Sequence, residues 1–347
     1  MVRVGIIGCG QVANFHVQGL SATNAKITAL ADINMENARK IGTCLDDVRI
    51  YDDYTTMLTD KKLDAVVIGL QNNLHHKVIL DCVEAGKAIF CEKPLTADVN
   101  ESKDIVDRIN KNNIIFMIGF MKRYHQAFMR MKEMINGLGP VIHGRVRQCI
   151  YVPIEKMRAD ILREEWWGWD KTASRGGALV HSGSHEIDLI RFLMGEPATV
   201  TAQLKYVDGL DAMEHYCAAM LEMQEGFSVL LDVTTMPYSK HNYISNGWIE
   251  EVEVYCEKGW VKLKNYSWDG SNPPELVCYS EAEQSVKNIF FTDCMQWENE
   301  MNHFIHCIEN NETPMTNQID GYRVDQIISD AYISGKENRK QEIVFAY

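Results

Sequence analysis

The stretch "VGIIGCGQVANFH", Val4–His16, decides the fold of the first part of this chain. A short apolar run leads into the spacing Gly8-x-Gly10-x-x-Ala13, and a helical pattern follows it. Gly8 permits a tight turn, Gly10 lets the backbone approach a pyrophosphate, and Ala13 lets the helix pack close to the strand. A tight turn without a ligand would use the same spacing, so the motif needs support from elsewhere in the chain.

An acidic residue at the end of the next strand-like run gives that support. In "ALADIN", Asp32 lies at the spacing expected for the carboxylate that binds the ribose of a dinucleotide. The amides of Gln11 and Val12 would face the same ligand from a helix N-terminus, where the helix dipole favours an anion. A carboxylate repels a 2′-phosphate, and Ile33 rather than a basic residue follows it. We therefore predict binding of NAD rather than NADP, with Ile33 among the contacting residues.

The first third of the chain alternates between two patterns. Strand-length apolar runs occupy residues 2–8, 26–32, 63–70, 87–93 and 113–120. Helical patterns occupy residues 12–21, 35–41, 75–85 and 98–112. Alternation of this kind predicts βαβ units and a doubly wound parallel sheet covered on both faces, the α/β architecture of a Rossmann domain.

The pattern changes near Arg123. A helical pattern at residues 126–135 precedes strand-like runs at residues 139–152, 199–207, 215–223, 227–235, 250–264 and 275–280. Helical patterns at residues 296–309 and 321–334 and a short strand at residues 342–347 close the chain. We predict a Rossmann domain over residues 1–122 and an α+β domain with an open, mostly antiparallel sheet over residues 123–347. The C-terminal helices would pack back toward the first domain.

Composition narrows the class of protein. The formal net charge of −13 argues against a nucleic-acid partner, which would require a basic face. No apolar stretch approaches the length of a membrane span. The ten cysteines form no C-x-x-C pair and fall singly, many within apolar runs, as is usual in a reducing compartment. We expect a cytoplasmic protein with a small-molecule substrate.

A lysine follows the fourth strand-like run, in "CEKPL". The carboxyl ends of parallel strands face the ligand crevice of an open sheet, so Lys93 would hydrogen-bond a substrate hydroxyl and stabilise its alkoxide character. The alternative is a solvated lysine before a helix that Pro94 opens at its first turn. Strand-end position alone does not separate the two interpretations.

The segment "GGALVHSGSHEIDLIRFL", Gly176–Leu193, places two histidines four residues apart. A zinc site is disfavoured because the H-E-x-x-H spacing is missing and no third ligand stands out, so we predict no metal. In a second interpretation Ser182 or Ser184 caps a helix and the histidines are polar neighbours. In a third, His185 lies in the first helical turn, where the dipole disfavours its charged form and leaves a neutral base.

Together these motifs resemble the glucose–fructose oxidoreductase, inositol dehydrogenase and rhizopine catabolism (Gfo/Idh/MocA) family. The similarity rests on the GxGxxA start with Asp32, on "AGKAIFCEKPL" and on the G-G-A-L-x-H-x-G-x-H-x-x-D segment, and it covers nearly the whole chain. The resemblance implies hydride transfer between NAD(P) and a carbohydrate, cyclitol or related carbonyl. It also implies a homodimer or homotetramer built through the C-terminal sheet.

The resemblance assigns roles to particular positions. Lys93 matches the family's active-site lysine and His185 its catalytic histidine, whereas His181 stands where many members carry Asp. Neutral imidazole offers one donor and one acceptor, so His181 would bond a substrate hydroxyl or relay a proton, and either histidine would serve as the main proton carrier, with His185 favoured. The family loop T-P-N-x-x-H lacks its Thr-Pro pair here. The further cofactor contacts expected are Leu70, Asn72, His75 and Glu92.

Aromatic and basic residues near the predicted crevice are candidate substrate contacts. Trp166, Trp167 and Trp169 precede the histidine segment, and Trp169 resembles the family's tryptophan there, although packing at an interface would use tryptophan equally well. Arg123 and Tyr124 follow the last strand of the first domain, where the alternatives are a surface salt bridge and a buried ring.

We therefore expect an NAD-dependent oxidoreductase acting on a sugar, cyclitol or glycoside-like polyol. Two other functions stay open. In one, tightly bound NAD assists glycoside cleavage or epimerisation by transient oxidation. In the other, the chain is a nucleotide-bound sensor without catalysis.

Overall fold

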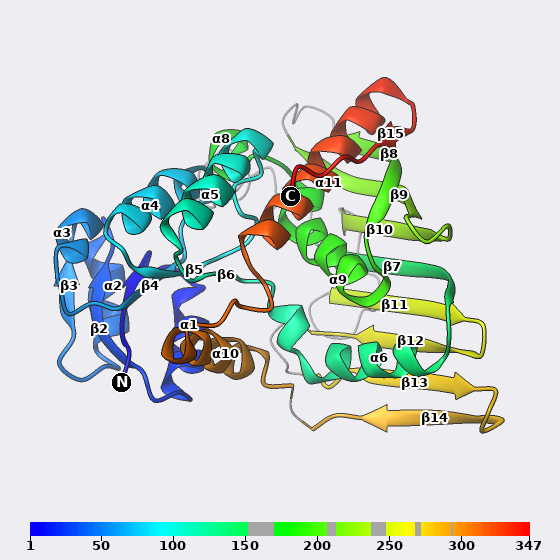
Figure 1. Cartoon of the computed structure of the whole chain (residues 1–347), viewed down its shortest axis with the longest axis horizontal. Coiled ribbons are helices and arrows are strands. Elements are labelled where there is room, and N and C mark those ends of the chain that lie inside the picture. The colour runs from blue at the N-terminus through cyan, green and yellow to red at the C-terminus, as the bar shows by residue number, and fades with distance from the viewer. Residues whose placement is uncertain (152–169, 207–212, 237–247, 268–271, 293) are drawn as a thin grey trace. The chain divides into compact units, whose positions relative to one another are not determined.

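The computed structural model describes residues 1–151, 170–206, 213–236, 248–267, 272–292 and 294–347 (Figure 1). The chain forms two compact units. The first combines Met1–Tyr124 with Gln296–Asp325, and the second combines His125–Met295 with Gln326–Tyr347. The helix α11, Gln318–Glu337, therefore begins in the first unit and ends in the second.

The first unit is built on a six-stranded parallel sheet. Its strands are β1 (Arg3–Ile7), β2 (Lys26–Ala31), β3 (Arg49–Tyr51), β4 (Ala65–Ile68), β5 (Ala88–Cys91) and β6 (Phe116–Ile118). The order β3-β2-β1-β4-β5-β6 reverses between β1 and β4, which confirms the doubly wound sheet predicted from the alternating patterns. The strand β3 was not predicted because three residues are too few to show a period.

Helices cover both faces of this sheet. They are α1 (Ala13–Ser21), α2 (Met35–Gly42), α3 (Tyr54–Leu58), α4 (Asn72–Glu84), α5 (Val99–Asn112), the 3₁₀ turn η1 (Met121–Tyr124) and α10 (Gln296–Asn310). Within this unit, α4 and α5 lie on one side and α1 and α10 on the other (Figure 1). The ring of Phe15 stacks on Trp297 at 4.9 Å, and a Cβ at Gly19 would lie 2.5 Å from the Trp297 carbonyl. The glycine therefore allows α1 and α10 to approach closely.

Several helix starts follow from local side chains. Asn34 accepts a hydrogen bond from Glu36 N–H, Asp53 from Thr55 N–H, and Asp98 from Asn100 and Glu101 N–H. These side chains satisfy backbone donors that the first helical turn leaves without partners. The helix α4 begins at Asn72, three residues before its predicted start at residue 75.

The second unit carries a nine-stranded sheet. Its strands are β7 (Val141–Tyr151), β8 (Pro197–Tyr206), β9 (Glu214–Met223), β10 (Ser228–Met236), β11 (Trp248–Cys256), β12 (Gly259–Asn265), β13 (Glu275–Ser280), β14 (Ser285–Phe290) and β15 (Gln341–Glu342). Their order is β14-β13-β12-β11-β7-β10-β9-β8-β15. The sheet is antiparallel as predicted, except that β7 and β10 pair in parallel. This pairing was not foreseen, because it joins strands far apart in the chain.

Helices cover one face of the second sheet. They are α6 (Gln126–Gly137), the π-helical turn η3 (Leu179–Gly183), α9 (Ser184–Met194) and the end of α11, while the short helix α8 (Lys171–Ser174) precedes η3 in the chain. Valines and leucines that alternate along the strands point to this side, among them Val146, Val229 and Leu231, each at most 2% exposed. The strand predicted over residues 342–347 is largely wrong, since only Gln341–Glu342 pairs with β8.

Candidate active site

The turn after β1 has the backbone that its glycines predict. Gly8 adopts a φ of 90° and donates its N–H to the Ala31 carbonyl at 2.9 Å. A Cβ on Gly8 would lie 2.5 Å from the Gly69 carbonyl oxygen, so no larger residue fits. A Cβ on Gly10, by contrast, would meet no atom within 4 Å. The turn therefore leaves open space directly above the Gly10 backbone.

The helix α1 begins beside this space. Val12 is its N-cap residue and makes no side-chain hydrogen bond to the first turn, while Gln11 is exposed and Ala13 is fully buried. No acidic residue lies in the first turn. A helix start without a side-chain cap suits an anionic ligand, which the backbone N–H groups and the dipole would hold.

Asp32 is held in place at the end of β2. Its Oδ2 accepts a hydrogen bond from Cys9 N–H at 2.7 Å, and its Oδ1 accepts one from Asn34 N–H at 2.8 Å. The Ile33 side chain next to it is 94% exposed. The open space at Gly10, the uncapped helix and the fixed carboxylate fit the pyrophosphate and ribose of a dinucleotide.

The loop after β4 is tied to the lysine segment by a buried histidine. His75 places Nδ1 3.0 Å from the Pro94 carbonyl and 3.1 Å from the Leu95 carbonyl, and Nε2 3.2 Å from the Leu70 carbonyl. Burial lowers the pKa of His75. Asn72 is 2% exposed, and Leu70 is half-buried. The two ring nitrogens of His75 thus contact backbone carbonyls of the loop after β4 and of the segment after Lys93.

Glu92 and Lys93 follow β5. Glu92 Oε1 lies 3.2 Å from His16 Nε2, and its Oε2 accepts the Lys93 N–H at 3.2 Å. Burial raises the pKa of Glu92, but His16 and Lys93 outweigh it and the net shift is downward. Burial lowers the pKa of Lys93, with Glu92 opposing and Lys122 adding to the shift. A pKa lowered by desolvation is typical of catalytic lysines, although structural ion-pair networks also shift pKa values.

Lys93 does not stand at a helix start. The segment continues through Thr96 and Ala97, and α5 begins only at Val99 with Asp98 as its cap. The alternative in which Pro94 opens a helix is therefore wrong. The loop is instead fastened by Asp325 of α11, which accepts hydrogen bonds from the N–H groups of Thr96 and Ala97.

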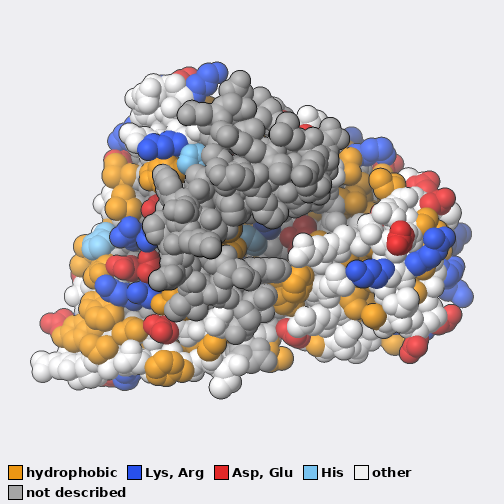
Figure 2. All heavy atoms as spheres, turned by 180° about the vertical axis from the view of Figure 1, so that it is seen from behind, with side chains coloured by type: hydrophobic (Ala, Val, Ile, Leu, Met, Phe, Trp, Pro, Cys, Tyr) orange, Lys and Arg blue, Asp and Glu red, His pale blue; other side chains and the backbone are white. Residues whose placement is uncertain are grey.

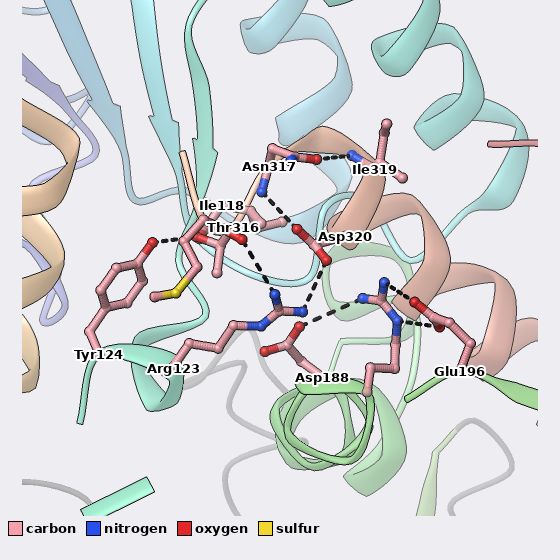
Figure 3. A network of polar contacts seen from close by, with 11 residues as sticks. Ile118, Arg123, Tyr124, Asp188, Glu196, Thr316, Asn317, Ile319 and Asp320 are labelled. Atoms are coloured by element: carbon pink, nitrogen blue, oxygen red, sulfur yellow. Dashed lines mark hydrogen bonds and ion pairs between the residues drawn. The ribbon is translucent and has the colours of Figure 1, made fainter. Parts of the chain in front are cut away.

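Arg123 and Tyr124 take part in polar contacts within the first unit (Figure 3). Arg123 is 7% exposed and pairs with Asp320 at 2.9 Å. The Tyr124 hydroxyl lies 3.0 Å from Thr316 Oγ1, and its ring is 3% exposed. Burial raises the pKa of Tyr124 strongly. Tyr124 is thus a buried ring, as one alternative had it, whereas the Arg123 pair is buried and is not the surface salt bridge named as the other alternative.

The two histidines lie in one continuous helical stretch rather than at a helix start. His181 belongs to the π-helical turn Leu179–Gly183, and His185 to α9, which continues from it. Gly183 has helical dihedral angles, and no side chain caps α9 at this position. The interpretation in which Ser182 or Ser184 caps a helix start is therefore wrong. The argument that the helix dipole keeps His185 neutral loses its basis, because His185 is not in the first turn.

A carboxylate from β9 caps this stretch instead. Glu214 accepts hydrogen bonds from Gly177 N–H at 3.1 Å and Leu179 N–H at 2.8 Å, and the Tyr332 hydroxyl donates to it at 2.9 Å. Burial raises the pKa of Glu214. Sequence reasoning missed this residue, because its partners lie more than 30 positions away.

In the same unit, charged residues along α9 are also paired. Arg191 makes two contacts of 2.8 Å with the Glu196 carboxylate and lies 3.7 Å from Asp188 Oδ1 (Figure 3). The guanidinium is 3% exposed, so this pair fixes the end of α9. His185 is 9% exposed on the same helix.

Some predictions fall outside the described part of the chain or concern absences. Trp166, Trp167 and Trp169 are not among the described residues. Within the described ranges, no three His, Cys, Asp or Glu side chains gather as metal ligands would. None of the helices described here has the length and apolar character needed to cross a membrane.

Comparison with known proteins places the chain. The profile "Oxidoreductase family, NAD-binding Rossmann fold" matches residues 2–120, and "GFO/IDH/MocA C-terminal domain" matches residues 128–262. The chain belongs to the Gfo/Idh/MocA oxidoreductase family. It is an NAD-binding oxidoreductase with a Rossmann domain.

Relatives of this Gfo/Idh/MocA protein are known in sequence and in structure. Inositol 2-dehydrogenase 3 of Saccharopolyspora erythraea is 29% identical over 312 residues, 87% of this chain and 86% of the relative. The scyllo-inositol 2-dehydrogenase (NAD(+)) of Bacillus subtilis is 24% identical over 335 residues, 92% and 90% of the two chains. A levoglucosan dehydrogenase in complex with NADH and levoglucosan superposes with a TM-score of 0.85 at 19% identity and covers 99% of this chain and 100% of its own. At that identity, the structural match shows the fold.

Proposed function

We propose that this protein oxidises a hydroxyl group of a sugar, cyclitol or glycoside-like polyol with NAD, or reduces the corresponding carbonyl. The observation that carries the proposal is the placement of Gly10, Asp32 and Lys93 directly after β1, β2 and β5 of one parallel sheet. Ligands of such sheets bind at the carboxyl ends of the strands, where the strand order reverses. The names of the inositol and levoglucosan relatives support a polyol substrate.

The proposed cofactor contacts follow from the turn and the carboxylate. The pyrophosphate would lie over Gly10 against the amides of Gln11 and Val12, and Asp32 would accept hydrogen bonds from the ribose. The exposed Ile33 would cover the adenine. NAD bound there supplies the nicotinamide that accepts or donates hydride. Because a 2′-phosphate would meet the Asp32 carboxylate, NAD is preferred over NADP.

The proposed catalytic roles use three side chains. Lys93 donates a hydrogen bond to the reacting oxygen and stabilises negative charge on it, an effect favoured by partial burial. His185 takes the hydroxyl proton in the oxidising direction and returns it in the other. His181 orients the substrate. Arg123 and Tyr124 support the site through their buried contacts.

Alanine substitutions at two glycines, one at the proposed site and one away from it, test cofactor binding without disturbing the fold. A Cβ meets no atom within 4 Å at either Gly10 or Gly137, and neither has a positive φ. Gly10→Ala should keep the melting temperature but weaken NAD binding at least about tenfold, a change of about 1.4 kcal/mol. Gly137→Ala, at the end of α6, should change neither. Equal NAD affinity of Gly10→Ala and wild type, measured by calorimetry, would refute the proposed pyrophosphate position.

Turnover distinguishes the proposed reaction from its two alternatives. Purified protein is screened for NADH formation with cyclitols, free sugars, glycosides and nucleotide sugars, using NAD and NADP separately. Net NADH formation with NAD supports the dehydrogenase. Copurified cofactor with product but without net NADH points to transient oxidation. Failure of every compound with both cofactors would remove the dehydrogenase proposal.

We propose that the face of the second sheet that bears Leu230 and Met220 is the subunit interface of a cytoplasmic homodimer or homotetramer. Leu230 and Met220 are directly opposite across β10 and β9, and they are 52% and 39% exposed. Figure 2 shows apolar and charged side chains side by side on the molecule seen from behind. Leu230→Glu should lower the mass measured by light scattering if this face joins the subunits. An unchanged mass would exclude it.

A further inference from the structure

A carboxylate from the second sheet holds the start of the helical stretch that carries both histidines. Glu214, the first residue of β9, accepts a hydrogen bond from Leu179 N–H at 2.8 Å on Oε1 and one from Gly177 N–H at 3.1 Å on Oε2. At a helix start, no residue of the helix itself can accept from such N–H groups. Glu214 is 2% exposed and belongs to the same unit as the stretch. These contacts therefore fasten the beginning of the stretch to the sheet.

The other end of the stretch is fastened as well. Arg191 makes two contacts of 2.8 Å with the carboxylate of Glu196, the residue before β8. A Cβ at Gly144 of β7 would collide with Met194 Sδ, so α9 ends in close contact with the sheet. The π-helical turn Leu179–Gly183 lies between these two fixed ends. Because neither end is free to rotate, the turn cannot readily convert into an ordinary α-helical turn.

The π-helical turn decides how the two histidines lie relative to each other. Its hydrogen bonds reach one residue farther along the chain than those of an α-helix, and such turns are frequent at functional sites. An α-helix rotates by about 100° per residue, so loss of the extra residue would rotate the preceding segment by that amount relative to α9. His181 lies within the turn, and His185 follows it. The ring of His181 also reaches back to Ser174, whose Oγ lies 2.6 Å from Nε2.

We propose that Glu214 is a positioning residue for the reaction: by holding Gly177 and Leu179 it maintains the π-helical turn and so sets the direction of His181 relative to His185. The inference rests on the proposed function, in which these two histidines serve the substrate. Burial raises the pKa of Glu214, whereas the hydrogen bonds from Leu179, Tyr332 and Gly177 oppose this shift. The same hydrogen bonds favour the charged carboxylate, which accepts on both oxygens.

Glu214→Gln removes one acceptor with little change in shape. The amide keeps one oxygen, but its NH₂ group cannot accept, so one backbone N–H loses its partner. In the full-length variant we expect faster amide hydrogen exchange over residues 177–183, measured by NMR. The ring signals of His181, identified by their loss in His181→Asn, should shift more than those of His185. Unchanged exchange together with unchanged His181 signals would overturn the proposal.

Two further variants separate positioning from stability. Tyr332→Phe removes the hydroxyl that donates to Glu214 at 2.9 Å but leaves both backbone contacts in place. It should lower the melting temperature, as Glu214→Gln does, without moving the His181 signals. Glu222→Gln makes the same substitution near the other end of β9, where the carboxylate accepts from Thr199 at 2.9 Å and is partly exposed. It should leave the His181 signals unchanged. If Tyr332→Phe moved these signals as far as Glu214→Gln, lost stability would explain both results and the proposal would fail.

Kinetics with a polyol substrate complete the test. Glu214→Gln should lower kcat roughly tenfold to a hundredfold, because a small displacement of a proton carrier is costly, while NAD affinity stays unchanged. Tyr332→Phe and Glu222→Gln should turn over the substrate at nearly the wild-type rate. A wild-type kcat in Glu214→Gln would overturn the positioning role and leave the proposed function intact. If the wild type turns over no polyol, the proposed function fails, and the exchange and histidine signals still decide whether Glu214 maintains the turn.

Discussion

Asp325 should make the stability of this protein depend on pH in the direction opposite to most carboxylates. It is 2% exposed on α11, and its Oδ2 accepts hydrogen bonds from Thr96 N–H, Ala97 N–H and the Ser102 hydroxyl at 2.9, 3.0 and 2.6 Å. Among the described residues, Oδ1 has no hydrogen-bond partner. Burial raises the pKa of Asp325 from 3.8 to about 6, because these hydrogen bonds compensate only part of the lost hydration.

The size and sign of the effect follow from this shift. A difference of two pKa units corresponds to about 3 kcal/mol in the free energy of unfolding. The folded state binds the proton below about pH 6 and the unfolded state only near pH 4. The contribution of Asp325 is therefore unfavourable at neutral pH, and this penalty is removed as the pH falls through 6 toward 4.

Asp325→Asn isolates the effect, since its side chain does not titrate. Unfolding by urea is followed by tryptophan fluorescence at several pH values from 4 to 8. As the pH is lowered from 8 to 4, the wild type should gain most of about 3 kcal/mol in unfolding free energy relative to Asp325→Asn. A flat difference, or one of opposite sign, would refute the reasoning.

A carboxylate with the opposite shift provides the control. Asp104 accepts a hydrogen bond from His76 at 2.8 Å, which lowers the pKa of Asp104. The stabilisation that Asp104 contributes is present above its unfolded pKa and is lost as the pH falls, so Asp104→Asn should show the reverse trend.

Asp325 holds the loop that follows Lys93. The Asp325→Asn variant should therefore also turn over substrate more slowly than the wild type at neutral pH.

Three further outcomes are expected. Lys93→Ala should reduce turnover roughly a hundredfold or more while NAD affinity, measured by calorimetry, changes little, because the lysine acts on the reacting oxygen; loss of NAD binding instead would assign it to the cofactor. Asp32→Asn should weaken NAD binding about tenfold, because it removes a charge-assisted hydrogen-bond acceptor. It should also narrow the preference for NAD over NADP, because the repulsion of the 2′-phosphate is lost. An unchanged ratio of the kcat/KM values with NAD and NADP would contradict this. Gly177→Ala should lower the free energy of unfolding by about 1–3 kcal/mol because its Cβ meets the Glu214 backbone, with Gly137→Ala as the neutral control; equal stability in urea would show that the segment adapts.

Features set by neighbours in sequence were predicted best. The Gly8 turn, the position of Asp32 and the alternation of strands and helices depend on residues within one βαβ unit, and the structure has them at nearly the expected places. Short elements without a readable period, such as α3 and β14, were not predicted. The strand predicted over residues 342–347 failed because an apolar run does not specify a pairing partner.

The sequence by itself determined the doubly wound sheet, the dinucleotide turn and the identity of the residues that carry the proposed chemistry. Only the tertiary structure decided how those residues are held. Glu214 caps the segment that carries His181, Asp325 fastens the loop after Lys93, and the Ser174 hydroxyl lies 2.6 Å from His181 Nε2. Two of these contacts join positions 35 and 229 residues apart, so they depend on the register and packing of distant elements. Only Ser174 lies near its partner in the chain, and even there a π-helical turn that no pattern predicted brings the hydroxyl and the ring together.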